Sequence, residues 1–265
     1  MSRNREIFIE VRNLHQRFGR HLVLRGVDLK IYRGETLCIL GGSGGGKSVL
    51  IKHLCGLMRP WKGSIIVEGE DITSLPEREL GAVRRKVSMM FQGGALFDSL
   101  TVAQNIAFPL REAGLRDQKE LDLRVRRALE IVRMSGQEKK MPADLSGGMR
   151  KRVALARAVV EMPACVLYDE PHAGLDPITS DSIDHLIRDL GVDHKVTNVV
   201  ITHELRSVFR IADRIAFMKD GVIYWKGTAD ELAASKDPEL VNFVQGRSEN
   251  RDGWDQDTPR IDTSG

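Results

Sequence analysis

The sequence is poor in cysteine and in aromatic side chains. Its three cysteines, Cys38, Cys55 and Cys165, lie far apart and form no Cys-x-x-Cys pair. This spacing excludes a disulfide framework and a zinc knuckle, and it suits a reducing cytosol. We expect the cysteines to be small apolar core residues. Because Phe, Trp and Tyr make up only 5% of the chain, an extensive surface for stacking nucleic-acid bases is not expected.

Long apolar runs and an excess of one charge are also missing. No stretch reaches the roughly 18 to 20 apolar residues of a membrane helix. The N-terminal segment MSRNREIFIEV has no apolar core of a secretory signal. Lys and Arg number 40 against 37 Asp and Glu, which leaves a net charge of +3 and indicates no nucleic-acid partner. If the protein works at a membrane, we expect it to dock on another protein there.

The length and the apolar pattern are typical of one large α/β domain, or of a domain with an inserted subdomain. The chain has 265 residues, of which 42% are hydrophobic and 29% charged, so it needs no disulfides to fold. The pattern predicts strands near 7–11, 27–31, 37–40, 64–67, 164–168, 198–202, 215–218 and 222–225. It predicts helices near 48–57, 178–190 and 204–211, and a mostly helical stretch from about 100 to 160.

The apolar pattern stops after Gly246, and residues 247–265 form a polar, acidic tail. Two interpretations stay open for this tail. It is either a frayed terminus or a short arm that docks on a partner through Trp254 and Ile261.

Residues 41–48 fit the pattern G-x-x-x-x-G-K-[ST] of a phosphate-binding loop. Glycines let backbone N–H groups turn toward phosphates, and the N-terminus of the following helix adds a favourable dipole. Lys47 is expected to reach the β- and γ-phosphates, and the Ser48 hydroxyl to bind Mg²⁺. A dinucleotide-binding loop is excluded, because its last glycine would fall on Lys47. The residues of the loop are Gly41, Gly42, Ser43, Gly44, Gly45, Gly46, Lys47 and Ser48.

Two carboxylates follow the apolar run of residues 165–168. Asp169 is placed to hold Mg²⁺, and Glu170 is the candidate general base for an attacking water. An apolar strand that ends in Asp-Glu is also common at protein surfaces. Its position downstream of a phosphate-binding loop favours the functional interpretation.

Ser146, Gly147 and Gly148 open a predicted helix and indicate a second anion site. One phosphate-binding loop and one further anion site per chain suggest that two chains share each nucleotide. With this motif the sequence resembles an ABC-transporter ATPase subunit, from about residue 7 to 246. The resemblance implies an α/β fold, a P-loop NTPase (ABC ATPase) core with an antiparallel β subdomain and an inserted helical subdomain at about 100–160. Residues 1–246 would form this single domain.

The resemblance also implies roles for single residues. Phe18 matches the aromatic residue that stacks on adenine, where most members have Tyr. Gln92 matches the glutamine that senses Mg²⁺ and the attacking water. Residues 146–148 match the signature motif, which contacts the γ-phosphate held by the other subunit. Asp176 matches the D-loop aspartate at the nucleotide, and His203 the switch histidine that contacts the γ-phosphate.

Two positions depart from the family pattern. Met149 stands where most members have Gln, and His172 stands where Thr or a similar residue is usual. Neither change removes a phosphate donor, a Mg²⁺ ligand or the base, so hydrolysis is still expected. His172 lies close to Glu170 and could tune it, although we expect an inert substitution.

Several segments are similar to the ATPase of the Mla/Mce-type lipid transporters, namely residues 47–53, 91–102, 108–110, 146–149 and 168–171. This resemblance implies an ATPase with ATP and Mg²⁺ as cofactors, peripheral on the cytoplasmic face of the inner membrane. It would power phospholipid transport between the inner and outer membranes. The implied partners are a second copy of the chain, an integral-membrane permease, a periplasmic Mce-domain lipid-binding protein and, in some systems, a small STAS-domain protein.

The implied mechanism places each ATP between residues 41–48 of one chain and 146–148 of the other. ATP binding closes the pair, because ATP contacts both halves only in the closed state. Glu170 then activates water, and Lys47 with Mg²⁺ stabilises charge on the γ-phosphoryl group. The part around residues 91–110 would transmit closure to a helix of the permease.

Three alternatives remain. An ABC ATPase for amino acids, metals or lipoproteins shares every core motif, and only the branch-specific segments argue against it. A non-transport ABC protein acting on DNA or ribosomes usually has two cassettes or a long coiled-coil insertion, and neither is present here. A nucleotide sensor without hydrolysis is disfavoured by the intact set of Lys47, Ser48, Asp169, Glu170 and His203.

Overall fold

The computed structural model describes residues 5–247. These divide into two compact units, one up to Ala229 and the other from Asp230 onward. The predicted acidic tail lies outside the described residues, apart from Arg247. The predicted domain bounds, 1–246 with a helical subdomain at about 100–160, stay predictions.

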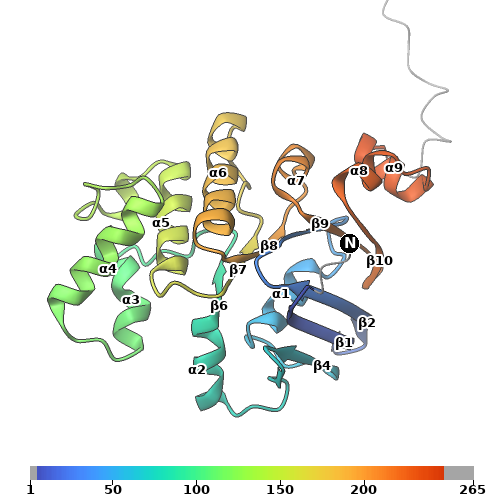
Figure 1. Ribbon diagram of the computed structural model, residues 1–265, viewed down its shortest axis with the longest axis horizontal. Coiled ribbons are helices and arrows are strands. Elements are labelled where there is room, and N and C mark those ends of the chain that lie inside the picture. The colour runs from blue at the N-terminus through green and yellow to red at the C-terminus, as the bar shows by residue number, and fades with distance from the viewer. Residues whose placement is uncertain (1–4, 248–265) are drawn as a thin grey trace, which may run out of the picture. The chain divides into compact units, whose positions relative to one another are not determined.

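The first unit contains two sheets (Figure 1). The strand order is β2-β1-β4-β5 in an antiparallel sheet and β10-β9-β3-β8-β7-β6 in a sheet that is parallel except at its β10–β9 edge. The strands are β1 (Ile7–Phe18), β2 (His21–Tyr32), β3 (Thr36–Leu40), β4 (Lys62–Val67), β5 (Glu70–Asp71), β6 (Val87–Met90), β7 (Cys165–Asp169), β8 (Thr197–Ile201), β9 (Arg214–Lys219) and β10 (Val222–Gly227). All eight predicted strands are confirmed.

The helices of the first unit include the predicted helical stretch, in which α3, α4 and α5 lie side by side (Figure 1). They are α1 (Lys47–Leu54), α2 (Glu77–Lys86), α3 (Val102–Glu112), α4 (Gln118–Ile131), a 3₁₀ turn η1 (Pro142–Asp144), α5 (Gly147–Val159), α6 (Pro177–Asp193) and α7 (Leu205–Ile211). Among residues 5–247, none of the helices combines the length and the apolar character needed to cross a bilayer.

The second unit is short and helical. Helix α8 (Ala229–Ala233) runs across the boundary, and α9 (Pro238–Gln245) follows it. Asp237 caps α9 by accepting the backbone N–H groups of Glu239 and Leu240, and the helix ends at Gly246 with a φ of 64°. This is the usual way in which an aspartate starts a helix and a glycine ends it.

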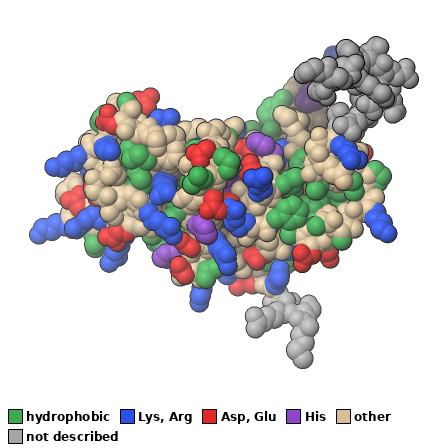
Figure 2. Space-filling model, turned by 90° about the horizontal axis from the view of Figure 1, so that it is seen from above, with side chains coloured by type: hydrophobic (Ala, Val, Ile, Leu, Met, Phe, Trp, Pro, Cys, Tyr) green, Lys and Arg blue, Asp and Glu red, His purple; other side chains and the backbone are tan. Residues whose placement is uncertain are grey.

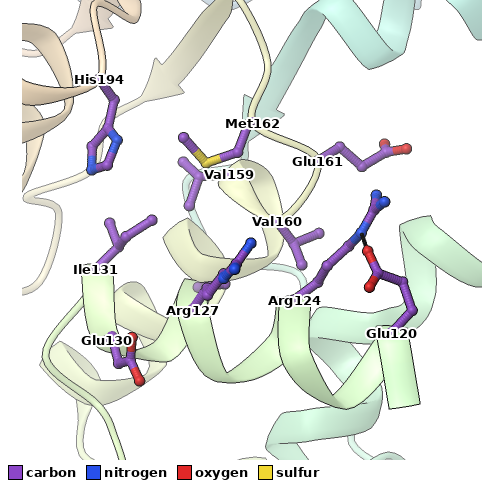
Figure 3. Close-up of a pocket in the computed structure, with 11 residues that line it drawn as sticks. Glu120, Arg124, Arg127, Glu130, Ile131, Val159, Val160, Glu161, Met162 and His194 are labelled. Carbon is purple, nitrogen blue, oxygen red and sulfur yellow. Dashed lines mark hydrogen bonds and ion pairs between the residues drawn. The ribbon is translucent and has the colours of Figure 1, made fainter. Parts of the chain in front are cut away.

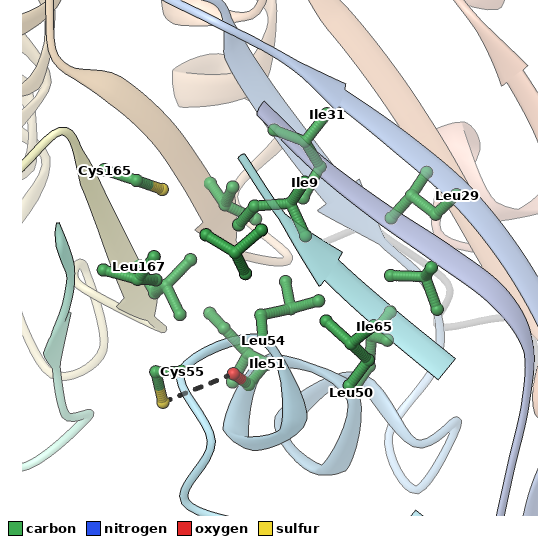
Figure 4. Close-up of a cluster of buried hydrophobic side chains, with 14 of the residues drawn as sticks. Ile9, Leu29, Ile31, Leu50, Ile51, Leu54, Cys55, Ile65, Cys165 and Leu167 are labelled. Atoms are coloured by element: carbon green, nitrogen blue, oxygen red, sulfur yellow. Dashed lines mark hydrogen bonds between the residues drawn. The ribbon is translucent and has the colours of Figure 1, made fainter. Parts of the chain in front are cut away.

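The phosphate-binding loop leads into a helix that is anchored in an apolar core. Helix α1 packs its residues Leu50, Ile51 and Leu54 between the two sheets (Figure 4). Ile9 and Ile31 face it from the antiparallel sheet. Strands β3, β7 and β8 are buried along their whole length, as expected for the middle of a parallel sheet covered on both faces. The loops that follow these three strands therefore start from rigid positions.

All three cysteines are buried, which confirms them as core residues. Burial raises the pKa of the Cys55 thiol to about 11, and it raises the pKa values of Cys38 and Cys165 as well. Buried thiols that keep their protons are poor nucleophiles. The cysteines therefore take no part in chemistry at the site.

The surface carries both charge signs, as the net charge of +3 predicts. On the face shown in Figure 2, Lys and Arg side chains alternate with Asp and Glu. This face offers no large area of one sign to a nucleic acid.

Candidate functional site

The phosphate-binding loop follows β3 and leads into α1. Gly41 has a φ of 147°, and a Cβ there would collide with the backbone carbonyl of Met218 on β9. Gly46, which caps α1, has a φ of 94°. Both positions need glycine, because a side chain would be blocked by the neighbouring strand or would strain the backbone. The loop is therefore held close against the edge of the parallel sheet.

Lys47 is the first residue of α1, and it is buried. Its Nζ atom donates hydrogen bonds of 2.8 Å to the carbonyl oxygens of Gly41 and Gly42. Burial lowers the pKa of the Lys47 ammonium, and the negative charges of Glu170 and Asp169 oppose this shift. The loop thus holds the ammonium group in place with its own carbonyls.

Ser48 and Asp169 meet where α1 begins and β7 ends. The Ser48 hydroxyl donates a hydrogen bond of 3.0 Å to Oδ1 of Asp169. A hydroxyl and a carboxylate are the oxygen donors that Mg²⁺ prefers, with substrate phosphates and water completing its shell. Residues 5–247 contain no group of three or more His, Cys, Asp or Glu side chains that could hold a metal by themselves. The donor set therefore fits a metal that binds together with its substrate.

Glu170 and His203 meet beyond the carboxyl ends of the adjacent strands β7 and β8. Nδ1 of His203 lies 2.9 Å from Oε2 of Glu170. The Glu170 backbone has a φ of 49°, which is unusual for a residue with a side chain, and its N–H donates to the Ile201 carbonyl at 2.9 Å. The Glu170 side chain is only 14% exposed, whereas that of His203 is 70% exposed. The Glu170 carboxylate and the His203 ring thus meet near Lys47 of the phosphate-binding loop.

The signature and D-loop residues form a second group. Ser146 caps α5 by accepting the Met149 N–H at 3.3 Å. Asp176 caps α6, and its bonds from Thr179 and the backbone lower its pKa. A Cβ built on Gly147 would touch Leu175, one residue before Asp176. Ser146 and Asp176 are exposed, so the two helix starts that they cap lie side by side at the surface.

Gln92 and Phe18 lie at the ends of strands. Gln92 stands two residues after β6, and its side chain is exposed. Phe18 is the last residue of β1 and is 49% exposed. An exposed aromatic ring is free to stack on a planar ligand. Neither residue is hydrogen-bonded through its side chain to the pairs described above, so their roles stay predictions.

Lys151 on α5 is a site residue that sequence reasoning missed. It is buried, and its Nζ atom donates to the carbonyl oxygens of Gln92 and Glu170, the latter at 3.4 Å. Burial lowers its pKa, against the charges of Glu170 and Asp169. In the sequence, Lys151 stands between Arg150 and Arg152 and looks like part of a solvated face. Only the packing of α5 shows that it joins two loops of the site.

His172 is buried as well, two residues after Glu170. It contacts Asp184 on α6 and Thr202 after β8 through its two ring nitrogens. The His172 ring is thus held by polar partners in the core, and the expectation that the substitution is inert for hydrolysis stays a prediction.

A separate cavity of about 490 Å³ lies between α4, the C-terminal end of α5 and His194 (Figure 3). Arg124 in its wall is paired with Glu120 at 2.6 Å. Ile131 and Met162 add apolar surface. None of the predicted site residues lines this cavity, so it does not belong to the nucleotide site.

The chain is similar to known proteins over most of its length. A family model described as ABC transporter matches residues 24–173. The chain is 38% identical over 241 residues to the probable ribonucleotide transport ATP-binding protein mkl of Mycobacterium leprae, covering 91% of this chain and 70% of that protein. It is 37% identical over 241 residues to the intermembrane phospholipid transport system ATP-binding protein MlaF of Haemophilus influenzae, covering 91% of each.

Among solved structures, the chain is similar to the ATP-binding cassette MJ0796 in a dimeric post-hydrolysis state with ADP and Pi. The TM-score is 0.77 at 29% identity, over 83% of this chain and 98% of that one. The predicted fold class is thereby confirmed. The nucleotide-binding loop, the carboxylates behind it and these relatives lead to one conclusion: the chain belongs to the ABC transporter family and is an ATP-hydrolysing subunit of such a transporter, homologous to MlaF.

Proposed function

We propose that this chain powers a transporter that moves phospholipid between membranes. The observation that carries the proposal is its similarity to MlaF of Haemophilus influenzae, which spans 91% of both chains. A second candidate is transport of another solute, because mkl of Mycobacterium leprae is named for ribonucleotide transport at similar identity. The segments that resemble the Mla/Mce branch favour the lipid.

ATP hydrolysis is proposed to use the residues that the fold brings together. Backbone N–H groups of residues 41–46 and the Lys47 ammonium bind the phosphates, and Phe18 stacks on adenine. Glu170 accepts a proton from the attacking water, and His203 donates to the γ-phosphate. Ser48, Asp169 and Gln92 would hold Mg²⁺, which supplies positive charge against the phosphate oxygens when it is bound.

Two copies of the chain are proposed to form a head-to-tail pair. Ser146, Gly147 and Gly148 stand at the exposed start of α5, where free N–H groups and the helix dipole suit an anion. Asp176 lies beside them. In a symmetric pair, this surface of one copy would face the phosphate-binding loop of the other. The relative MJ0796 is a dimer in its own structure.

Residues 91–110 are proposed to contact a membrane permease. Phe97 and Phe108 are 44% and 37% exposed, and their ring centroids lie 4.7 Å apart. Asn105, which is fully buried, bonds to both backbone groups of Phe97 and so fixes this apolar pair. Apolar side chains held rigidly at the surface are typical of protein contacts. Through this contact the chain would lie at the cytoplasmic face of the inner membrane.

A Mce-domain protein and a small STAS-domain protein are further proposed partners, from the resemblance to the Mla branch alone. The experiment isolates the Glu170→Gln protein from solubilised native membranes with ATP and Mg²⁺, and identifies the retained proteins and lipids by mass spectrometry. Lys47→Ala serves as the matched control, because its weaker binding of ATP should disfavour the closed pair. A permease with a Mce-domain protein and phospholipid supports the proposal. A different permease with a solute-binding protein overturns the lipid assignment, and no membrane partner overturns the transport assignment.

A further inference from the structure

A chain of buried polar side chains lies behind the Glu170–His203 pair. Nε2 of His172 lies 2.7 Å from Oδ1 of Asp184 on α6. Nδ1 of His172 lies 3.3 Å from Oγ1 of Thr202, which follows β8. The side chains of His172 and Asp184 are 4% and 0% exposed. A carboxylate removed so fully from water must be bound by polar partners.

Arg210 on α7 supplies the second partner of Asp184. Its Nη1 atom donates a hydrogen bond of 3.0 Å to Oδ2 of Asp184 and also pairs with Asp181 on the surface of α6. The Asp184 carboxylate is thus bound on one oxygen by His172 and on the other by Arg210. This arrangement ties helices α6 and α7 to the loop that follows Glu170.

One arrangement of protons satisfies every atom of this network. In this arrangement Nε2–H of His172 donates to Asp184 at 2.7 Å, and Nδ1 of His172 accepts the Thr202 hydroxyl proton at 3.3 Å. The Thr202 oxygen in turn accepts the backbone N–H of Glu204 at 3.0 Å. Fully satisfied buried networks hold their members in one geometry, because any displacement leaves a polar group unpaired.

Residues of the network stand close to both members of the Glu170–His203 pair in the sequence. His172 stands two residues after Glu170, and Thr202 and Glu204 stand on either side of His203. Strand β8 ends at Ile201 and α7 begins at Leu205, so residues 202–204 belong to no regular element. The Thr202 hydroxyl oxygen accepts the backbone N–H of Glu204 and so holds this segment. The hydroxyl is held in turn by its contact with His172.

We propose that His172 is a positioning residue: it holds residues 202–204 so that the His203 ring meets Glu170 and the γ-phosphate together. The inference rests on the proposed roles of Glu170 and His203. A displacement of about 1 Å at a catalytic group can lower a rate by about 100-fold. The contacts that hold the neighbours of His203 in place should therefore have a large effect on kcat.

The first test compares three variants of the full chain. His172→Phe keeps a ring of similar shape but loses both polar contacts, whereas His172→Gln keeps an amide N–H that can donate to Asp184. Thr202→Val keeps the His172 ring and removes only the hydroxyl. We expect kcat for ATP to fall about tenfold or more in His172→Phe and Thr202→Val, with partial recovery in His172→Gln. The KM for ATP should change less than about twofold, because the phosphate-binding loop is untouched.

The control is His185→Gln, on the same helix as Asp184. His185 is exposed and pairs with Asp181 at 3.5 Å, so its loss should leave kcat unchanged. Thermal unfolding of every variant establishes that the folded protein is being compared. If His172→Phe does not fold, the near-isosteric Thr202→Val carries the test. A folded Thr202→Val with wild-type kcat overturns the inference.

The second test is a double-mutant cycle with His203→Ala, measured with radiolabelled ATP so that slow rates are resolved. If His172 acts through His203, His172→Phe or Thr202→Val will lower kcat by less than about twofold once His203 is absent. If His172 has a merely structural role, its loss will lower kcat by the same factor with His203 present and with His203→Ala. That result would overturn the inference about His172 and leave the proposed role of His203 standing. A His203→Ala variant with wild-type kcat would instead overturn the proposed role of His203, and the inference with it.

Discussion

The Ser48 hydroxyl and the Asp169 carboxylate form a hydrogen bond of 3.0 Å, although 121 positions separate them in the chain. The contact exists because the parallel sheet aligns the carboxyl ends of β3 and β7. A phosphate-binding loop extends from one end and a carboxylate from the other, as is usual for ligand sites at such an edge. The same edge carries Glu170 and His203.

Ser48→Ala and Asp169→Asn should weaken the affinity for the Mg²⁺ that supports ATP hydrolysis. Each change removes or neutralises one of the two oxygens that fit the ion, so the Mg²⁺ concentration for half-maximal rate should rise about tenfold or more. Titration of Mg²⁺ in a phosphate-release assay measures this. Ser43→Ala, in the same loop, is the matched control, and an unchanged midpoint in both site variants would contradict the assignment.

Lys47→Ala should lower the affinity for ATP about ten- to a hundredfold. The ammonium group is already held in the loop by two carbonyls, and a charged hydrogen bond to phosphate contributes about 1.5–3 kcal/mol. Equilibrium binding of a fluorescent ATP analogue measures the change. Lys52→Ala, one turn further along α1, should bind normally; equal affinities of the two variants would argue against a phosphate contact.

Glu170→Gln should keep ATP binding and lose turnover by at least about 100-fold, because the amide cannot accept a proton from water. With ATP and Mg²⁺ the protein should elute as a stable dimer in size-exclusion chromatography. Glu130→Gln on α4 is the control and should hydrolyse normally. Hydrolysis by Glu170→Gln at the wild-type rate would show that another group is the base.

Gly41→Ala and Gly44→Ala separate two reasons for glycine in the loop. Both glycines have positive φ values, 147° and 76°. A Cβ at Gly41 collides with the Met218 carbonyl, whereas nothing lies within 4 Å of one at Gly44. We expect Gly44→Ala to lower the free energy of unfolding by about 1–3 kcal/mol, and Gly41→Ala to lower it further. Urea denaturation measures both, and equal losses would show that the contact with β9 is unimportant.

Alkaline pH should destabilise the fold through its buried thiols. The pKa of Cys55 is raised from 9.0 to about 11 in the folded protein. Between these values the unfolded chain releases a proton that the folded chain keeps. Stability is therefore complete below about pH 9 and declines as the pH rises toward 11. Denaturation at pH 8 and 10.5, with Cys55→Ala as the control, should show a smaller decline in the variant. Alkylation of native protein at pH 8.5 should be slow.

Sequence patterns predicted most of the central sheet, and they missed elements with weak patterns. The apolar runs of β3, β7 and β8 are unmistakable, because strands buried on both faces consist almost entirely of apolar residues. The turn that joins β9 and β10 is equally local, since Asp220 and Gly221 both have positive φ values. Helix α2 and strand β6 were not predicted. Helix α2 is mostly polar and buries only Leu80 and Val83, and β6 is four residues long, so each offers too few apolar residues to form a recognisable pattern.

The sequence by itself determined the chemistry expected of this protein, because a phosphate-binding loop is built from residues that are adjacent in the chain. Residues 41–48 carry their glycines, lysine and serine within eight consecutive positions, and Asp169 and Glu170 stand at the end of an apolar strand. Only the tertiary structure decided which polar side chains support these groups. Lys151 looks ordinary in the sequence and His172 stands out only as an unusual residue at its position, yet both are buried against the loops of the site. Their partners lie on other helices and strands, and packing, which no local pattern encodes, brings them together.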